Sequence, residues 1–124
     1  MSEPSNELLE GFATVQRLLR ANRPVEYEAT AATFKVHLPG QPGWSVCRLV
    51  EFGGEHPGVL VPLPAEMVAN LVPLLEATPA GPRWSKIALM SRHDLRVIGP
   101  ALCAAWDACS DGAASGAQQE EPAG

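Results

Sequence analysis

The sequence lacks a disulfide framework and a long apolar run. Its three cysteines, Cys47, Cys103 and Cys109, are an odd number, and their spacing matches neither a Cys-x-x-Cys pair nor a zinc knuckle. This usage is typical of proteins in reducing compartments. No apolar run approaches the ~18–20 residues that cross a bilayer, and residues 1–4 lack the basic and apolar regions of a signal peptide. We therefore expect a cytoplasmic protein.

The catalytic and cofactor motifs that a short chain can carry are also missing. There is no Gly-x-Ser-x-Gly elbow, and Gly53-Gly54 is not followed by the Gly-Lys-Ser/Thr of a phosphate loop. Cys47 could pair with His37 across neighbouring strands as a nucleophile and base. A cysteine in such a strand is more often a small buried apolar residue. The sequence thus predicts a protein that is not an enzyme and that binds no metal or cofactor.

Basic residues are absent from both ends of the chain, so the net charge of −5 comes mainly from the two ends. Residues 1–11 and 110–124 each carry three acidic side chains and no Lys or Arg, whereas residues 12–109 carry nine basic and eight acidic ones. Residues 110–124 are mostly Ala, Gly, Gln and Glu and show no periodicity, which is typical of disorder. We expect one domain over residues 1–109, followed by a disordered acidic tail over residues 110–124.

The hydrophobic pattern predicts an α+β fold. Apolar residues recur at helical spacing over residues 6–22, from Pro64 to residue 77, and near residues 95–109. Alternating or continuous apolar runs predict strands over residues 25–38, as two strands or one bent strand, and over residues 44–52, 58–63 and 84–90. We expect an antiparallel sheet of about four to five strands with the helices packed on one face.

Basic and aromatic residues alternate on the predicted strands. Lys35 and Arg48 lie near Phe34, Trp44 and Phe52 in the sequence. Aromatic rings can stack on the bases of a single strand while cations bind its phosphates. The alternative is that the aromatic side chains fill the core and the basic residues only keep the open face hydrated.

Residues 32–77 resemble the positive-cofactor-four type of transcriptional coactivator. The resemblance rests on Ala32-Thr33-Phe34-Lys35-Val36, on Val46-Cys47-Arg48-Leu49-Val50-Glu51-Phe52, and on the stretch from Gly54-Glu55-His56-Pro57-Gly58 to Pro64-Ala65-Glu66-Met67. That family, like the related purine-rich-element-binding and Whirly proteins, has a curved sheet with a helix, dimerises and binds single-stranded DNA. The resemblance implies a homodimer that regulates transcription and places Lys35, Trp44 and Arg48 on a nucleic-acid-binding face.

A second class of function is a protein-binding factor. The order of helix, three strands, helix, strand and helix, together with a pI near 5.1, is similar to that of type III secretion chaperones. Those proteins dimerise and bind an unfolded segment of another protein over an apolar surface. An inhibitor of another protein belongs to the same class. We therefore expect a non-catalytic regulator that binds single-stranded nucleic acid through a sheet face, with a protein-binding factor as the alternative.

Overall fold

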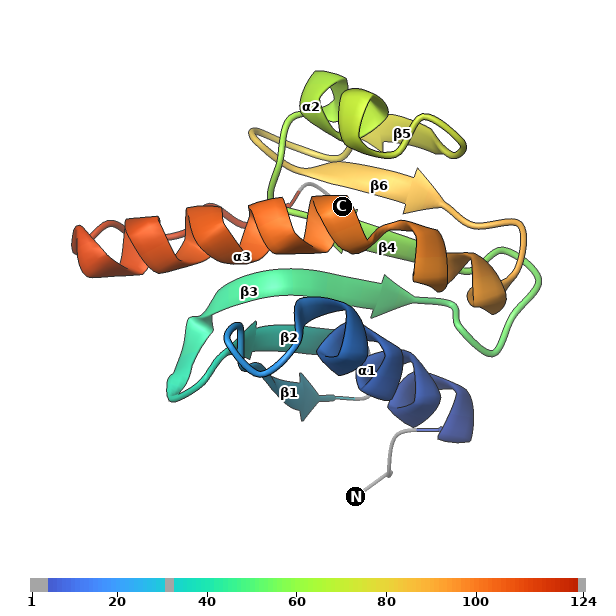
Figure 1. The fold of residues 1–124 in the computed structure, drawn as a ribbon, viewed down its shortest axis with the longest axis horizontal. Coiled ribbons are helices and arrows are strands. Elements are labelled where there is room, and N and C mark those ends of the chain that lie inside the picture. The colour runs from blue at the N-terminus through green and yellow to red at the C-terminus, as the bar shows by residue number, and fades with distance from the viewer. Residues whose placement is uncertain (1–4, 31–32, 123–124) are drawn as a thin grey trace.

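The computed structural model, which describes residues 5–30 and 33–122, has the expected α+β class (Figure 1). Its open antiparallel sheet has six strands, not four to five, in the order β1-β2-β3-β4-β6-β5. The elements are α1 (Asn6–Leu19), β1 (Glu26–Ala29), β2 (Phe34–Leu38), β3 (Gln41–Val50), β4 (Gly58–Val61), α2 (Ala65–Leu71), β5 (Glu76–Pro79), β6 (Ser85–Ala88), the 3₁₀ helix η1 (Arg92–Val97) and α3 (Gly99–Ala114).

Helix α1 begins where the sequence predicts and ends three residues earlier. The side chain of Ser5 accepts a hydrogen bond from the backbone N–H of Leu8, which caps the first turn. The helix stops at Leu19 because Arg20 adopts a φ of 66°, outside the helical region. Val15 and Leu19 lie on the buried side of the helix.

The first three strands form two hairpins. β1 and β2 are separate strands that pair antiparallel, which decides between the two possibilities for residues 25–38; Ala31 and Ala32 lie outside the described residues. A tight turn at Pro39-Gly40 joins β2 to β3, with Gly40 at a φ of 70° that suits glycine. Strand β3 therefore starts at Gln41 rather than at Trp44.

Strand β5 begins within the stretch that the sequence predicts as helix, so the prediction of a helix up to residue 77 is wrong. Helix α2 ends at Leu71 because Pro73 cannot continue it, and the chain then returns as Glu76–Pro79 to pair with β6. The run is only four residues long and ends in proline. A proline is tolerated there because β5 is an edge strand, which needs no hydrogen bonds on its outer side.

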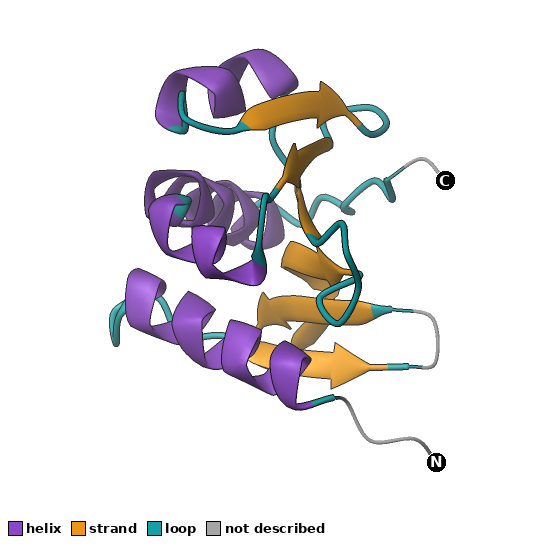
Figure 2. Ribbon diagram, turned by 90° about the vertical axis from the view of Figure 1, so that its right-hand side faces the viewer, coloured by secondary structure: helices purple, strands orange, loops and turns teal. Residues whose placement is uncertain are grey.

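The helices pack on one face of the sheet, as expected. In Figure 1, α3 crosses the middle of the sheet between α1 and α2, and Figure 2 shows the helices on one side of the strands. The main core lies between these layers. Helix α3 continues to Ala114, so residues 110–114 are helical and the predicted start of a disordered tail at residue 110 is wrong. No helix among the described residues is long and apolar enough to span a membrane.

Gly112 on α3 is in close contact with Trp44, and this contact gives a first prediction. A Cβ atom at Gly112 would lie 2.4 Å from the Trp44 ring. Gly112→Ala is expected to lower the free energy of unfolding by about 1 kcal/mol, because overpacking costs about 1–3 kcal/mol and outweighs a gain of about 1 kcal/mol in helix propensity. In a Trp44→Ala background the same substitution should stabilise the protein. Urea unfolding of the unmodified protein, the two single variants and the double variant measures these changes. If Gly112→Ala changed the free energy of unfolding in the same direction with Trp44 as with Ala at position 44, the contact would be refuted.

Candidate functional site

The face of the sheet opposite the helices carries a row of residues in direct register across all six strands. Each residue of the row is the direct cross-strand partner of the next. The pairs are Glu28↔Lys35, Lys35↔Arg48, Arg48↔Leu60, Leu60↔Lys86 and Lys86↔Thr78. Directly opposite residues share a face, so their side chains lie side by side. We call these residues the cross-strand row: Glu28, Lys35, Arg48, Leu60, Lys86 and Thr78.

Two of the three predicted site residues come together in this row and the third does not. Lys35 and Arg48 are direct cross-strand partners. Trp44 instead packs against Gly112 of α3, on the helix side. The reason is a bulge: Val36 pairs with Cys47 and His37 with Ser45, so β3 holds one extra residue between these two pairs. An extra residue reverses the alternation of side chains along a strand. The expectation that Trp44 shares a face with Arg48 is therefore wrong.

The aromatic residue beside Arg48 is Trp84, which the sequence reasoning did not assign to the site. The Arg48 guanidinium lies 5.3 Å from the centre of the Trp84 ring, within the range of a cation–π contact. Trp84 is 2% exposed, yet it lies outside the main core cluster. The one signal in the sequence is that Trp84-Ser85 repeats the Trp44-Ser45 pair after a similar Gly/Pro turn.

Residues 115–122, which we call the C-terminal segment, cross from the helix layer to the open face. Gly116, at a φ of 79°, ends α3, and hydrogen bonds from the N–H of Gly116 to Ala113 and from that of Ala117 to Gly112 close the turn. This is the pattern of a Schellman cap, which suits glycine at that position. Figure 2 shows the segment leading to the side of the sheet opposite the helices.

The segment is held first by Gln119. Its side-chain amide donates to the backbone carbonyl of Ser45 and accepts from the Ser45 N–H, each at 2.8 Å. The β3–β4 pairing covers only Arg48 to Val50, and β4 ends at Val61. The earlier part of β3 thus has no β4 neighbour, and the Gln119 amide takes the place of one. Backbone groups at an unpaired strand edge are available for such contacts.

The next two residues of the segment reach Trp84 and Arg48. The indole N–H of Trp84 donates to the backbone carbonyl of Glu120 at 2.6 Å, and the Glu121 carboxylate accepts a hydrogen bond from Nη2 of Arg48. The Arg48 side chain is 12% exposed, and its Nε atom is buried without a hydrogen-bond partner among the described residues. One acidic peptide segment therefore occupies the site but leaves part of Arg48 unsatisfied.

The charges on the open face are arranged with cations in the middle and acids at the margins. Lys35, Arg48 and Lys86 lie on β2, β3 and β6. The aliphatic part of the Lys86 side chain packs over Gly58, where an added Cβ would lie 2.8 Å from Cε of Lys86. Glu28 on β1 and Glu76 on β5 lie on the same face at the two edge strands. This pattern attracts a short acidic segment more than a long polyanion, which would meet acids at both edges.

The possible pairing of Cys47 with His37 is not supported by the register. Cys47 is opposite Val36, whereas His37 is opposite Ser45, and Nδ1 of His37 lies 2.7 Å from the carbonyl oxygen of Leu38. Burial raises the pKa of the Cys47 thiol well above its usual range. A thiol with a raised pKa is a poor nucleophile at neutral pH.

The two buried thiols give a second prediction. Burial also raises the pKa of Cys109 to about 12, against a smaller lowering by the Gln119 hydrogen bond. We expect Cys103, which is half-buried, to react first with a disulfide reagent at pH 8, and Cys47 and Cys109 to react only as fast as the protein opens. Their thiolates should appear in the folded state only at strongly alkaline pH. Equal, rapid labelling of all three thiols would contradict this burial.

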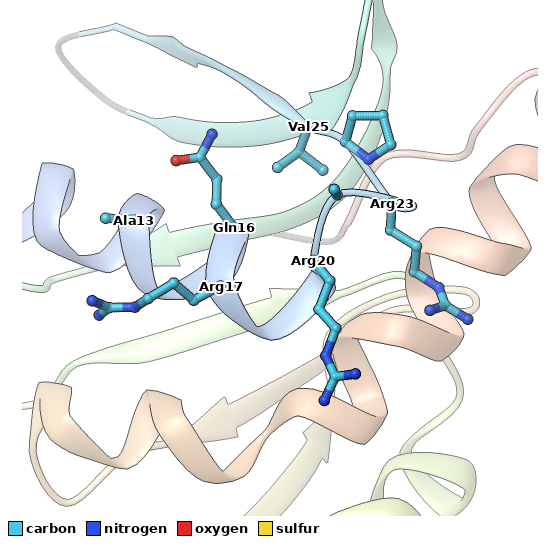
Figure 3. Close-up of a pocket in the computed structure, with 8 residues that line it drawn as sticks. Ala13, Gln16, Arg17, Arg20, Arg23 and Val25 are labelled. Atoms are coloured by element: carbon cyan, nitrogen blue, oxygen red, sulfur yellow. The ribbon is translucent and has the colours of Figure 1, made fainter.

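A second cluster of cations lines a cavity of about 440 Å³ at the end of α1, but it does not form an anion site. Arg23 is paired with Asp107 at 3.1 Å, and Arg17 donates to Thr14. Figure 3 shows Arg17 pointing away from Arg20 and Arg23. Side chains that diverge in this way cannot bind one anion together, so these arginines are a solvated helix end with one ion pair.

The comparisons with known proteins give no relative. No family model, no curated protein and no solved structure matches the chain. Within residues 5–30 and 33–122, no group of three His, Cys, Asp or Glu side chains could hold a metal ion.

Proposed function

We propose that this protein is a non-enzymatic binding module that holds an extended acidic segment of another protein on the open face of its sheet. The observation that carries the proposal is the C-terminal segment, an acidic peptide that occupies this face. The site recognises three features of it: the Gln119 side chain by Ser45, the carbonyl of Glu120 by Trp84, and the Glu121 carboxylate by Arg48. Backbone and side-chain recognition together are typical of peptide-binding sites.

The C-terminal segment is suited to be displaced. The Glu121 side chain is 70% exposed, and ion pairs at that exposure contribute about 1 kcal/mol or less. The segment uses only Nη2 of Arg48 and leaves Nε buried without a partner. A carboxylate that accepted from both nitrogens would form the stronger, bidentate pair. A partner segment of that kind competes with a tethered one, whose effective concentration is on the order of millimolar.

Single-stranded nucleic acid is the second candidate for the same face. It is favoured by one observation, namely that Lys35, Arg48 and Lys86 belong to one cross-strand row beside the Trp84 ring. Cations interleaved with an aromatic ring suit phosphates and bases. The acids at both edge strands and the position of Trp44 against α3 favour a peptide instead.

The test uses the full chain with a labelled peptide of the sequence of residues 115–121, and a labelled mixed-sequence single-stranded oligonucleotide, read by anisotropy. Glu121→Ala removes the tethered carboxylate from Arg48, so the variant is expected to bind the peptide several-fold more tightly than the unmodified protein. Glu55→Ala, in the exposed loop before β4, is the matched control and should change nothing. Oligonucleotide binding that weakens steeply with salt, without peptide binding, would replace the proposal by the second candidate.

A further inference from the structure

Beside the acidic site lies an apolar pocket of about 510 Å³. It lies where the C-terminal segment leaves α3 and approaches Trp84. Its walls come from the start of β3, the β4–α2 connection, the loop before β6 and the end of α3. The side chains that give it an apolar character are Trp44, Pro62, Pro64, Met67, Pro82 and Trp84.

The C-terminal segment borders this pocket but does not fill it. Ala117 and Gln118 line it and both are exposed, and the first carries only a methyl group. On the wall of the pocket, Met67 is 44% exposed and Trp44 is half-buried. Exposed apolar side chains around a concave site mark a place where an apolar group binds. The segment therefore satisfies the polar part of the site and leaves its apolar part open.

We propose that the partner segment carries a large aliphatic side chain three or four positions before the carboxylate that binds Arg48. The spacing follows from the protein's own segment, in which Ala117 and Gln118 border the pocket and Glu121 pairs with Arg48. This inference rests on the proposed function and adds a specificity to it. A partner with both features outcompetes the tethered segment because it also buries apolar surface that the segment leaves exposed.

The pocket is suited to an aliphatic side chain by the groups that line it. Two indole rings and three prolines form stiff apolar walls, and Met67 has an unbranched side chain that adapts to the shape of what it meets. One cation, the exposed Arg83, also lines the pocket, whereas Arg48 lies against Trp84 at the acidic end. Apolar and acidic recognition are thus separated along the segment by the Gln119 and Glu120 contacts.

The experiment compares three peptides on the full-length Glu121→Ala variant: the sequence of residues 115–121 unchanged, the same with leucine in place of Ala117, and the same with leucine in place of Gln118. Binding is read by anisotropy of a label at the peptide's N-terminus. The better of the two leucine peptides is expected to bind at least about tenfold more tightly than the unchanged peptide, since burying several methylene groups has at least this effect. Met67→Ala, which removes part of the wall, should reduce that ratio to about threefold or less.

The outcomes separate this inference from the proposal on which it rests. Equal binding of all three peptides overturns the apolar specificity and leaves the acidic site in place. Binding of none of them at millimolar concentration overturns both. Two further outcomes also overturn the inference. The first is that the oligonucleotide, added alone, displaces the bound peptides. The second is that gel filtration shows a dimer that Glu121→Ala dissociates, which would identify the segment of a second copy as the occupant. A leucine preference that Met67→Ala removes supports it.

Discussion

Replacing Trp84 with alanine is expected to lower the free energy of unfolding by about 3–5 kcal/mol, the usual range for a buried aromatic residue. The side chain is 2% exposed, and its ring lies against the Arg48 guanidinium. Its loss also removes the hydrogen bond to the Glu120 carbonyl, so the C-terminal segment should become mobile. Urea unfolding measures the first effect, and amide exchange of residues 115–121 measures the second.

Trp84→Phe is the matched control. It keeps a ring for Arg48 and for burial but removes the indole N–H, and a single hydrogen bond contributes about 1 kcal/mol. We expect a loss of that order together with partial release of the segment. If the phenylalanine and alanine variants were equally unstable, burial of the ring would not be the main contribution of Trp84.

Replacing Arg48 with methionine is expected to weaken binding of the acidic peptide about 30-fold or more. Arg48 is largely buried, and truncating one member of a buried charged pair costs about 2–5 kcal/mol of binding free energy. Methionine preserves most of the length of the side chain, so its packing against Trp84 and the fold are retained, while the cation–π attraction is lost. The readout is the peptide anisotropy titration, with the unfolding midpoint measured on the same samples.

Lys35→Met is the control for this effect. Lys35 is the direct neighbour of Arg48 in the cross-strand row, with the same sign of charge, but no contact joins it to the C-terminal segment among the described interactions. We expect a change of less than about threefold, from the loss of long-range attraction alone. Equal losses in the two variants would mean that the face attracts acids by its overall charge, without a specific pair at Arg48.

The sequence predicted some elements well because their signals are local. Helix α1 has its capping serine and its apolar stripe within a few residues of each other, so its start was correct. Strand β5 has no such signal: it is a short run ending in proline that becomes a strand only because β6 lies beside it. The bulge in β3 is likewise not visible in the sequence, because it depends on which residues of β2 are opposite.

For the site, local pattern was sufficient to propose Lys35 and Arg48 but not to choose their aromatic partner. Both lie on alternating strands joined by a short hairpin. Their direct pairing also needs the register shifts in β3, because the Leu38↔Gln41 register at the turn would otherwise put Trp44 opposite Lys35. Trp84 reaches Arg48 from a distant part of the chain, because β6 pairs on one side with β4, which is the neighbour of β3 in the sheet. The contact of Glu121 with Arg48 joins residues 73 positions apart.

The sequence by itself determined the fold class, the near-neutral middle of the chain and the acidity of its ends, since composition and periodicity are properties of neighbouring residues. Only the tertiary structure decided where the acidic C-terminal segment lies on the sheet. Gly116 turns the chain out of α3, and the early end of β4 leaves the Ser45 backbone open to Gln119. The segment is held because unpaired backbone groups and a buried cation need partners, and those groups come together only when the sheet has formed.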